Sequence, residues 1–187
     1  MVVPPTTLDT LRNDLKQRRL NISQSNKFVP YIRLDGVVAE AICIGLYCPM
    51  GGEPDPWLIA RNFAGLTSLP TLESATAGMI FRKWTHGDML VKTSWGGQQP
   101  LSEATAVVPD VIFVPLLGYD LSLNRIGQGG GHYDRYLAAN PGACRIGIAW
   151  EAQRLDAIDA QPWDVPLDAV LTEATFYVKD LTRCRNL

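Results

Sequence analysis

A cluster of glycines, followed at once by charged and aromatic residues, is the feature that most constrains this chain. Residues 124–135 read NRIGQGGGHYDR, so four glycines occupy the five places from Gly127 to Gly131. The apolar stretch VIFVPLL at 111–117 precedes the cluster, and the helix-forming stretch HYDRYLAA follows it. The glycines are therefore expected between the carboxyl end of a buried strand and the amino end of a helix.

This position favours a phosphate-binding loop. The amino end of a helix exposes unpaired N–H groups and partial positive charge, and glycines let a phosphate approach the backbone closely. The spacing differs from the Rossmann fingerprint, and the Gly-Lys-Ser/Thr sequence of a P-loop does not follow. The alternative interpretation is a tight turn without a ligand.

The charged residues beside the glycines fit phosphate chemistry. Arg125 and Arg135 bracket the loop and could pair with phosphate oxygens. Asp134 falls in the predicted first helical turn, where a carboxylate complements the helix dipole but repels a phosphate. A magnesium ion that bridges carboxylate and phosphate oxygens would remove this conflict. Without the loop, Asp134 would be interpreted as an ordinary first-turn acid.

Apolar segments of strand length alternate with helix candidates along the chain. The strand candidates are Ile42–Cys48, Met79–Trp84, Val107–Leu117, Cys144–Trp150 and Ala169–Leu171. The helix candidates between them are Pro56–Ala64 and Tyr133–Ala139. Strands that are apolar throughout and separated by helices predict a sheet covered on both faces, in an α/β layered domain.

A first helix is predicted at about residues 7–20, where leucines recur at helical spacing. Arg12, Lys16 and Arg19 lie on a neighbouring face of this helix. They form either a solvated basic stripe or a positive surface that faces an anionic ligand.

The composition indicates a globular, cytoplasmic protein. Of the 187 residues, 47% are hydrophobic and 19% charged, and a formal net charge of −2 disfavours a protein that binds duplex nucleic acid. The longest apolar run, AICIGLYCP at 41–49, is far below the roughly 20 residues of a membrane span. The four cysteines, at 43, 48, 144 and 184, include no C-x-x-C pair, so a zinc site is disfavoured and free thiols are expected.

Five stretches that span nearly the whole chain carry a family resemblance. They are LRNDLKQRR, YCPMGGEPDP, FRKWTHGDML with KTSWGGQQP, DVIFVPLLGYDLSLNRIGQGGGHYDRYL, and QPWDVPLDAVLTE. In this order they resemble the 5-formyltetrahydrofolate cyclo-ligases, also called 5,10-methenyltetrahydrofolate synthetases. The resemblance implies one Rossmann-like, three-layer α/β domain over residues 1–187, with a mostly parallel central sheet and its glycine loop at 125–133.

The resemblance also implies an activity and its small molecules. The reaction would be the ATP- and Mg²⁺-dependent cyclisation of 5-formyltetrahydrofolate to 5,10-methenyltetrahydrofolate, with ADP and phosphate as products and a phosphorylated formyl group as intermediate. Reduced folate and ATP would be the partners of a cytoplasmic monomer or dimer, without nucleic acid or membrane.

Site residues are implied position by position. Asp134 and Asp164 would bind the metal, and Glu53 and Trp95 the folate, with paired hydrogen bonds from Glu53 to the pterin. The ATP phosphates would be held by Arg12 and by the loop residues Arg125, Ile126, Gly127, Gln128, Gly129, Gly130, Gly131, His132 and Tyr133. Within this loop Gly130, His132 and Tyr133 would also contact the folate, and Arg125, His132 and Tyr133 would be catalytic. Taken alone, Glu53 in its Gly/Pro-rich turn would be interpreted as a solvated loop acid.

Three features differ from the family pattern. Leu8 stands where a lysine commonly lies, four residues before the arginine matched by Arg12, and Gln128 and Gly130 lie in a loop that often carries a cation. His132 replaces a tyrosine or phenylalanine and could become cationic near a phosphate. Leu8 keeps a second hypothesis open, a diverged paralogue that binds ATP or folate without efficient turnover. A third hypothesis is a ligase that acts on another pterin-like substrate.

Overall fold

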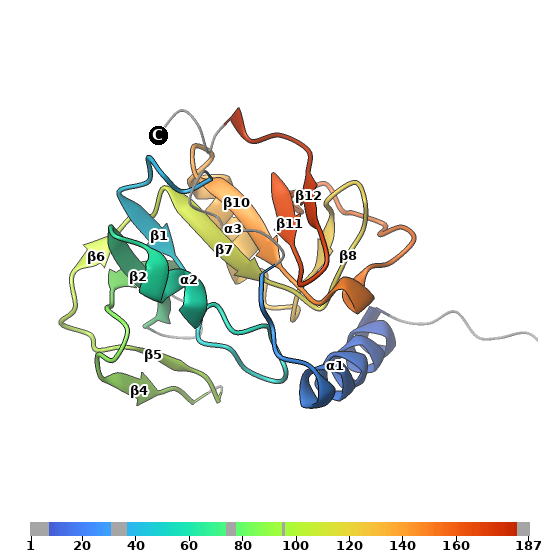
Figure 1. Cartoon of the computed structure of the whole chain (residues 1–187), viewed down its shortest axis with the longest axis horizontal. Helices are drawn as coiled ribbons and strands as arrows, with labels where there is room; N and C mark the ends of the chain where they lie inside the picture. The colour runs from blue at the N-terminus through green and yellow to red at the C-terminus, as the bar shows by residue number, and fades with distance from the viewer. Residues whose placement is uncertain (1–7, 31–36, 74–77, 95, 183–187) are drawn as a thin grey trace, which may run out of the picture.

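The computed structural model of the chain describes residues 8–30, 37–73, 78–94 and 96–182 (Figure 1). The helices are α1 (Leu8–Ser25), α2 (Trp57–Asn62), α3 (His132–Ala139) and the 3-10 turn η1 (Glu151–Gln153). The strands are β1 (Cys43–Gly45), β2 (Leu66–Leu72), β3 (Met79–Lys83), β4 (Leu90–Lys92), β5 (Gln98–Pro100), β6 (Ala106–Val107), β7 (Val111–Pro115), β8 (Gly118–Tyr119), β9 (Arg125–Ile126), β10 (Cys144–Ile148), β11 (Ala169–Leu171) and β12 (Phe176–Val178).

An eight-stranded sheet in the order β12-β11-β10-β7-β1-β2-β3-β6 forms the centre of the fold. The strands from β11 to β2 pair in parallel, and antiparallel strands complete both edges. Since β7 pairs with both β1 and β10, it lies in the middle of the sheet, and its carboxyl end lies in the middle of the row of strand ends. In open α/β sheets these carboxyl ends are where ligands bind.

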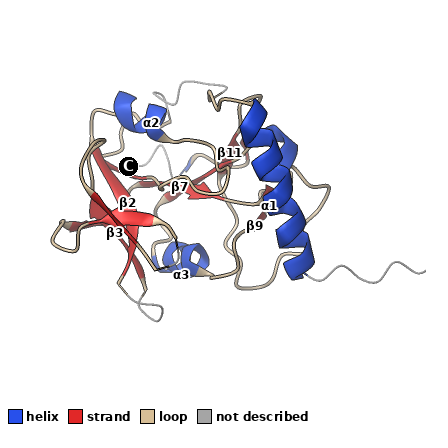
Figure 2. Cartoon of the chain, turned by 90° about the horizontal axis from the view of Figure 1, so that it is seen from below, coloured by secondary structure: helices blue, strands red, loops and turns tan. Residues whose placement is uncertain are grey.

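Alternate side chains of β7 enter two different hydrophobic layers. Val111 and Phe113 belong to the layer that includes α2, whereas Ile112 and Val114 belong to the layer that includes α3. Figure 2 shows α2 and α3 on opposite faces of the sheet. A strand buried on both faces must be apolar throughout, which explains the continuous run VIFVP. The predicted α/β fold with a mostly parallel central sheet is confirmed.

Helix α1 lies beside the carboxyl-terminal ends of the strands, near the end of β7, and does not cover a face of the sheet (Figures 1 and 2). Its Leu15 is buried in a small cluster with Leu117 and Ile126, against which Leu11 also packs. Ile126 ends β9 and is followed directly by the glycine loop. The leucine face of α1 therefore holds this helix beside the loop.

Several predicted element boundaries differ from the structure. The first helix continues to Ser25, and residue 7 lies outside the described residues. The segment Val107–Leu117 contains two strands, β6 and β7, and the hairpin β8–β9 separates β7 from the glycine loop. Strand β2 was not predicted because its sequence, LTSLPTL, contains polar residues and Pro70. This proline is tolerated because it lies beyond Ser68, the last residue of β2 that pairs with β1.

The cysteine prediction is only partly correct. Cys43 and Cys48 are free thiols, but Cys144 is disulfide-bonded, so the expectation of a free thiol is wrong there. Spacing along the sequence does not show which thiols meet in the fold. Cys184 lies outside the described residues. Among the helices of the described part, none has the length and apolarity to cross a membrane.

Candidate functional site

The glycine loop has a backbone conformation that side chains disfavour. Gly129 and Gly131 have φ angles of +100° and +62°, in the left-handed region. Gly131 is also the N-cap of α3, so the helix begins where the loop ends. A Cβ atom added at Gly129 would lie 3.3 Å from the guanidinium of Arg12. The loop therefore brings bare backbone and a helix amino end together under an arginine, an arrangement suited to phosphate.

Arg12 connects α1 to this loop. Its Nε donates to the carbonyl oxygen of Gly127 at 3.3 Å, and its Nη1 pairs with the Asp9 carboxylate at 3.0 Å. The Arg12 side chain retains 23% exposure, so it is oriented toward the loop and still open to a ligand. Leu8, one helical turn earlier, is 51% exposed and carries no charge.

Arg125 and Asp134 form an ion pair where α3 begins. The Nη2 of Arg125 lies 2.6 Å from the Oδ1 of Asp134, and the same oxygen accepts the N–H of Val165 at 3.2 Å. The Nη1 of Arg125 donates to the carbonyl oxygen of Val165. Both charged groups stand at the glycine loop, but each is the partner of the other. A phosphate or metal ion bound here would therefore compete with the pair.

Asp164 directly precedes Val165 and so lies on the segment that the ion pair contacts. Its Oδ2 accepts the N–H of Gln161 at 2.8 Å. Among the described residues, no three His, Cys, Asp or Glu side chains are grouped to hold a metal ion. Magnesium commonly binds one or two protein carboxylates and completes its octahedron with phosphates and water. Two carboxylates would be enough for such an ion, so the assignment of Asp134 and Asp164 to magnesium stays a prediction.

His132, the first residue of α3, faces Arg135. The Nη2 of Arg135 lies 3.2 Å from the Nδ1 of His132 and donates to the carbonyl oxygen of Gly130 at 2.9 Å. Burial, and then the charge of Arg135, lower the pKa of His132. Its own surroundings therefore favour the neutral imidazole at pH 7, and only an added anion would favour the cationic form that the sequence suggested.

Tyr133 carries a buried hydroxyl that has no hydrogen-bond partner in the described part of the chain. Burial raises the pKa of Tyr133, and the negative charge of Glu53 raises it further. Buried hydroxyls are normally hydrogen-bonded, so this one is available to a ligand. Its proximity to Glu53 places it between the glycine loop and the predicted folate acid.

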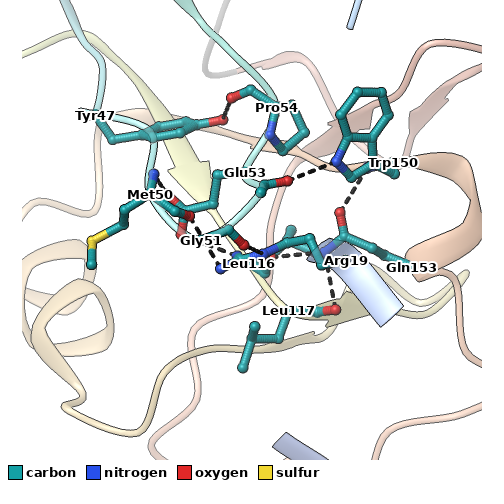
Figure 3. A network of polar contacts seen from close by, with 11 residues as sticks. Arg19, Tyr47, Met50, Gly51, Glu53, Pro54, Leu116, Leu117, Trp150 and Gln153 are labelled. Carbon is teal, nitrogen blue, oxygen red and sulfur yellow. Dashed lines mark hydrogen bonds and ion pairs between the residues drawn. The ribbon is translucent and has the colours of Figure 1, made fainter. Parts of the chain in front are cut away.

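Glu53 is buried, so the interpretation as a solvated loop acid is wrong. Its side chain is 5% exposed, its Oε1 lies 3.0 Å from the Nη1 of Arg19, and its Oε2 accepts the N–H of Met50 at 3.1 Å (Figure 3). The Gln128 side chain of the glycine loop lies near enough to help lower the pKa of this carboxyl. Burial raises the pKa of Glu53, and these three groups oppose that rise. The predicted folate acid and the predicted phosphate loop thus lie close together.

A cavity of about 330 Å³ opens beside the turn that carries Glu53. One wall comes from the segment that follows β1 and the other from the β4–β5 hairpin. Its lining residues are Cys48, Pro49, Met50, Lys92, Thr93, Gly96, Gly97 and Gln98. Trp95, the remaining predicted folate residue, lies outside the described residues, although its neighbour Gly96 lines the cavity.

The sequence profile of the 5-formyltetrahydrofolate cyclo-ligase family matches residues 6–173. The chain belongs to this family. A 5-formyltetrahydrofolate cyclo-ligase of Haemophilus influenzae is 31% identical over 146 residues, which cover 71% of this chain and 76% of the relative. The corresponding protein of Mycolicibacterium smegmatis is 30% identical over 184 residues, covering 90% and 94%. That of Mus musculus is 34% identical over 186 residues, covering 87% and 92%.

Solved structures of this cyclo-ligase family have the same fold. The 5,10-methenyltetrahydrofolate synthetase of Aquifex aeolicus superposes with a TM-score of 0.68 at 23% identity, covering 90% of this chain and 92% of the other. The synthetase of Mycoplasma pneumoniae gives a TM-score of 0.64 at 23% identity, covering 89% and 98%. The family profile and the curated relatives confirm the family resemblance inferred from the sequence, and these structures confirm its fold.

Sequence reasoning missed two residues near this cyclo-ligase site. Arg19 was placed on the basic face of α1, as part of a solvated stripe or of a surface facing an anionic ligand, but it is buried against Glu53. Lys92 lines the cavity from β4, a strand that was not predicted. The stretch KTSWGGQQP, quoted above for the family resemblance, was the available signal for Lys92. No local pattern indicated Arg19, because its partner is 34 residues away.

Proposed function

We propose that the chain catalyses the ATP- and Mg²⁺-dependent cyclisation of 5-formyltetrahydrofolate to 5,10-methenyltetrahydrofolate. The observation that carries this proposal is the pair of contacts made by α1: Arg12 bonds to the Gly127 carbonyl oxygen of the glycine loop, and Arg19 pairs with the buried Glu53 carboxylate. They join a loop suited to phosphates with a buried acid suited to an aminopyrimidine edge. A reaction that moves a phosphoryl group onto a folate requires this adjacency, because the reacting atoms must meet in one geometry.

The proposed reaction has two steps. The terminal phosphorus of ATP bonds to the formyl oxygen as its bond to ADP breaks, which turns an amide-like oxygen into a leaving group. The folate N10 then bonds to the formyl carbon and loses its proton, and the carbon–oxygen bond breaks to release phosphate. Phosphoryl transfer requires mainly positioning and positive charge.

The proposed roles follow from where the side chains lie. Arg12 and the loop backbone, including the N–H groups of Gly129 and Gly131, would hold the phosphates. Arg125 would exchange its contact with Asp134 for a phosphate oxygen and stabilise the transferred charge. Magnesium, when bound by Asp134 and Asp164, would supply further neutralisation of phosphate charge.

The folate would lie between Glu53 and the β4–β5 hairpin. Glu53 would accept two hydrogen bonds from the pterin, and Gly130, His132 and Tyr133 would close the side next to ATP. Trp95 is assigned to this substrate on the family resemblance alone. We also propose that residues 1–187 act as one cytoplasmic domain, as a monomer or dimer.

The direct test mixes the purified protein with 5-formyltetrahydrofolate, ATP and magnesium, and follows the near-ultraviolet absorbance of the methenyl product. We expect a rise that requires all three components and consumes one ATP per product. Product formation without ATP consumption would contradict the mechanism. ATP consumption that only another pterin stimulates would indicate a ligase with a different substrate.

Exposed Leu8 supports the second candidate, a diverged paralogue that binds ATP or folate without efficient turnover. If a cation is useful here, Leu8→Lys should lower the KM for ATP by about fivefold, because a surface cation near a phosphate contributes about 1 kcal/mol. The gain should shrink at high salt. Leu8→Gln, which adds length without charge, is the control, and an equal gain with glutamine would exclude an electrostatic cause. Turnover that appears only with lysine would identify the native chain as the paralogue.

Tyr133→Phe should separate ligand binding from stability. Its hydroxyl has no partner in the described protein, so removing it should leave the melting temperature unchanged or raise it. The KM for 5-formyltetrahydrofolate should rise about five- to tenfold, as expected for the loss of one hydrogen bond to the ligand. Tyr136→Phe, on the same helix, is the matched control. A lower melting temperature with an unchanged KM would show that the Tyr133 hydroxyl serves the fold.

A further inference from the structure

Arg19 is the most deeply buried charged side chain of α1. It is 1% exposed, although it belongs to a helix whose other arginines reach solvent or the glycine loop. Arginine is seldom fully buried unless it is paired and hydrogen-bonded. The contacts of Arg19 therefore indicate what this burial serves.

Most of these contacts go to the turn that carries Glu53 (Figure 3). The Nε of Arg19 donates to the Gly51 carbonyl oxygen at 2.9 Å, and its Nη2 donates to that of Met50 at 3.3 Å. Its Nη1 pairs with Glu53 at 3.0 Å and donates to the Leu116 carbonyl oxygen, just beyond β7, at 3.2 Å. All three guanidinium nitrogens are used, and they join the turn to the carboxyl end of the central strand.

The turn needs such support because its two adjacent glycines do not fix a single backbone conformation. Gly51 and Gly52 have φ angles of +56° and +78°, and adjacent glycines have many alternative conformations. Trp150 supports the turn from another side, since its Nε1 donates to the Gly52 carbonyl oxygen at 2.9 Å. Arg19 is the support that also contacts the functional carboxylate.

Arg19 also provides the positive charge that Glu53 faces. The other titratable groups around this carboxylate are Tyr47, Cys48 and Tyr133, and each has a pKa raised by burial. These groups are therefore neutral at pH 7. Burial favours the protonated form of Glu53, and the Arg19 charge opposes it. Removal of this charge would favour a protonated acid, in which one oxygen carries a proton, so that the pterin cannot donate one hydrogen bond to each of the two oxygens.

We propose that Arg19 is a positioning residue for the folate site, which holds the Met50–Glu53 turn in place and presents the Glu53 carboxylate to the pterin. The inference rests on the proposed cyclo-ligase function. Arg12 and Arg19 lie seven positions apart on α1, so one helix supports both the phosphate loop and the folate turn. Lysine cannot replace arginine here, because one ammonium cannot bond to the four oxygens that the planar guanidinium reaches.

The test compares Arg19→Lys and Arg19→Met with Arg18→Met, which changes the exposed neighbour. We expect both Arg19 variants to raise the KM for 5-formyltetrahydrofolate roughly 10- to 100-fold while the KM for ATP changes about twofold or less. Arg18→Met should match the wild type. In Arg19→Met, folate binding should improve as the pH rises through the raised pKa of Glu53, whereas wild-type binding should be flat near neutral pH.

Three results would overturn the proposal. They are a wild-type folate KM in a folded Arg19→Lys protein, equal losses of ATP and folate affinity in the Arg19 variants, and an Arg18→Met protein as impaired as they are.

The wild-type protein provides a second measurement, which does not depend on whether the Arg19 variants fold. The Met50 and Glu53 N–H groups, which bond to Glu53 Oε2 and Met50 O, should exchange slowly with solvent. Rapid exchange there would exclude a turn held in place. A wild-type protein without turnover would refute the proposed function. The solvent exchange of the Met50 and Glu53 N–H groups would then be the measurement that tests whether Arg19 holds the turn.

Discussion

Replacing Asp134 with asparagine should abolish magnesium-dependent turnover, with a loss of roughly 10³-fold in kcat. Asparagine has nearly the same shape but no charge, so it cannot neutralise magnesium beside ATP. Its oxygen can still accept the Val165 N–H, which the Asp134 carboxylate accepts at 3.2 Å. The weakened contact with Arg125 should cost about 2 kcal/mol of folding free energy, and the protein should remain folded. Steady-state rates over a magnesium titration, with circular dichroism of the folded protein, provide the measurement.

The Arg125–Asp134 ion pair makes the controls essential. If Asp134 serves only to hold Arg125, then Arg125→Lys should reproduce the loss and the magnesium dependence of the residual rate should stay unchanged. If Asp134 binds magnesium, the residual rate of Asp134→Asn should require a higher magnesium concentration. Asp164→Asn should show a weaker shift of the same kind, and exposed Asp159→Asn should show none. Unchanged activity in Asp134→Asn would refute the metal assignment.

The sequence predicted those parts of the fold whose cause is local. The strand VIFVP is apolar at every position because both of its faces are buried, and Ala169–Leu171 was predicted with its observed bounds for the same reason. The short hairpins were not predicted, since strands such as β8 and β9 have only two residues each. Strand β2 was missed because its sequence contains polar residues and a proline, which are not typical of a buried strand. They are tolerated because β2 pairs with β1 only as far as Ser68, and this pairing depends on the arrangement of the whole sheet.

The site shows the same division between local and distant causes. Glycines with positive φ and a first-turn aspartate are visible in the sequence because their causes lie within a few residues. The burial of Glu53 is not visible, because it depends on α1 and on the glycine loop, which lie 34 and 75 positions away at Arg19 and Gln128. Family resemblance identified Glu53 without this geometry, but it did not identify Arg19 as its partner.

Glu53→Gln should weaken folate binding by roughly 100-fold while ATP binding changes about twofold or less. Hydrogen bonds to a charged acceptor contribute about 1.5–3 kcal/mol each, and a loss near 3 kcal/mol corresponds to about two orders of magnitude in affinity. A glutamine amide offers one acceptor oxygen and turns a donor group toward the donors of the pterin. Titration calorimetry with each ligand separately measures both affinities, and the exposed Glu40→Gln is the matched control.

The pH dependence of folate binding provides a further test of the role of Glu53. Burial raises the pKa of Glu53 above that of an ordinary glutamate, and the protonated acid cannot accept the paired hydrogen bonds. Wild-type folate affinity should therefore fall as the pH decreases through this raised pKa, whereas Glu53→Gln should bind weakly without that dependence. The variant also leaves Arg19 buried without its carboxylate, which should lower the free energy of unfolding by about 3–5 kcal/mol. Melting curves recorded with and without ATP must therefore show that it is folded at the assay temperature. A folded Glu53→Gln that binds the folate normally would remove Glu53 from the substrate site and leave it a purely structural partner of Arg19.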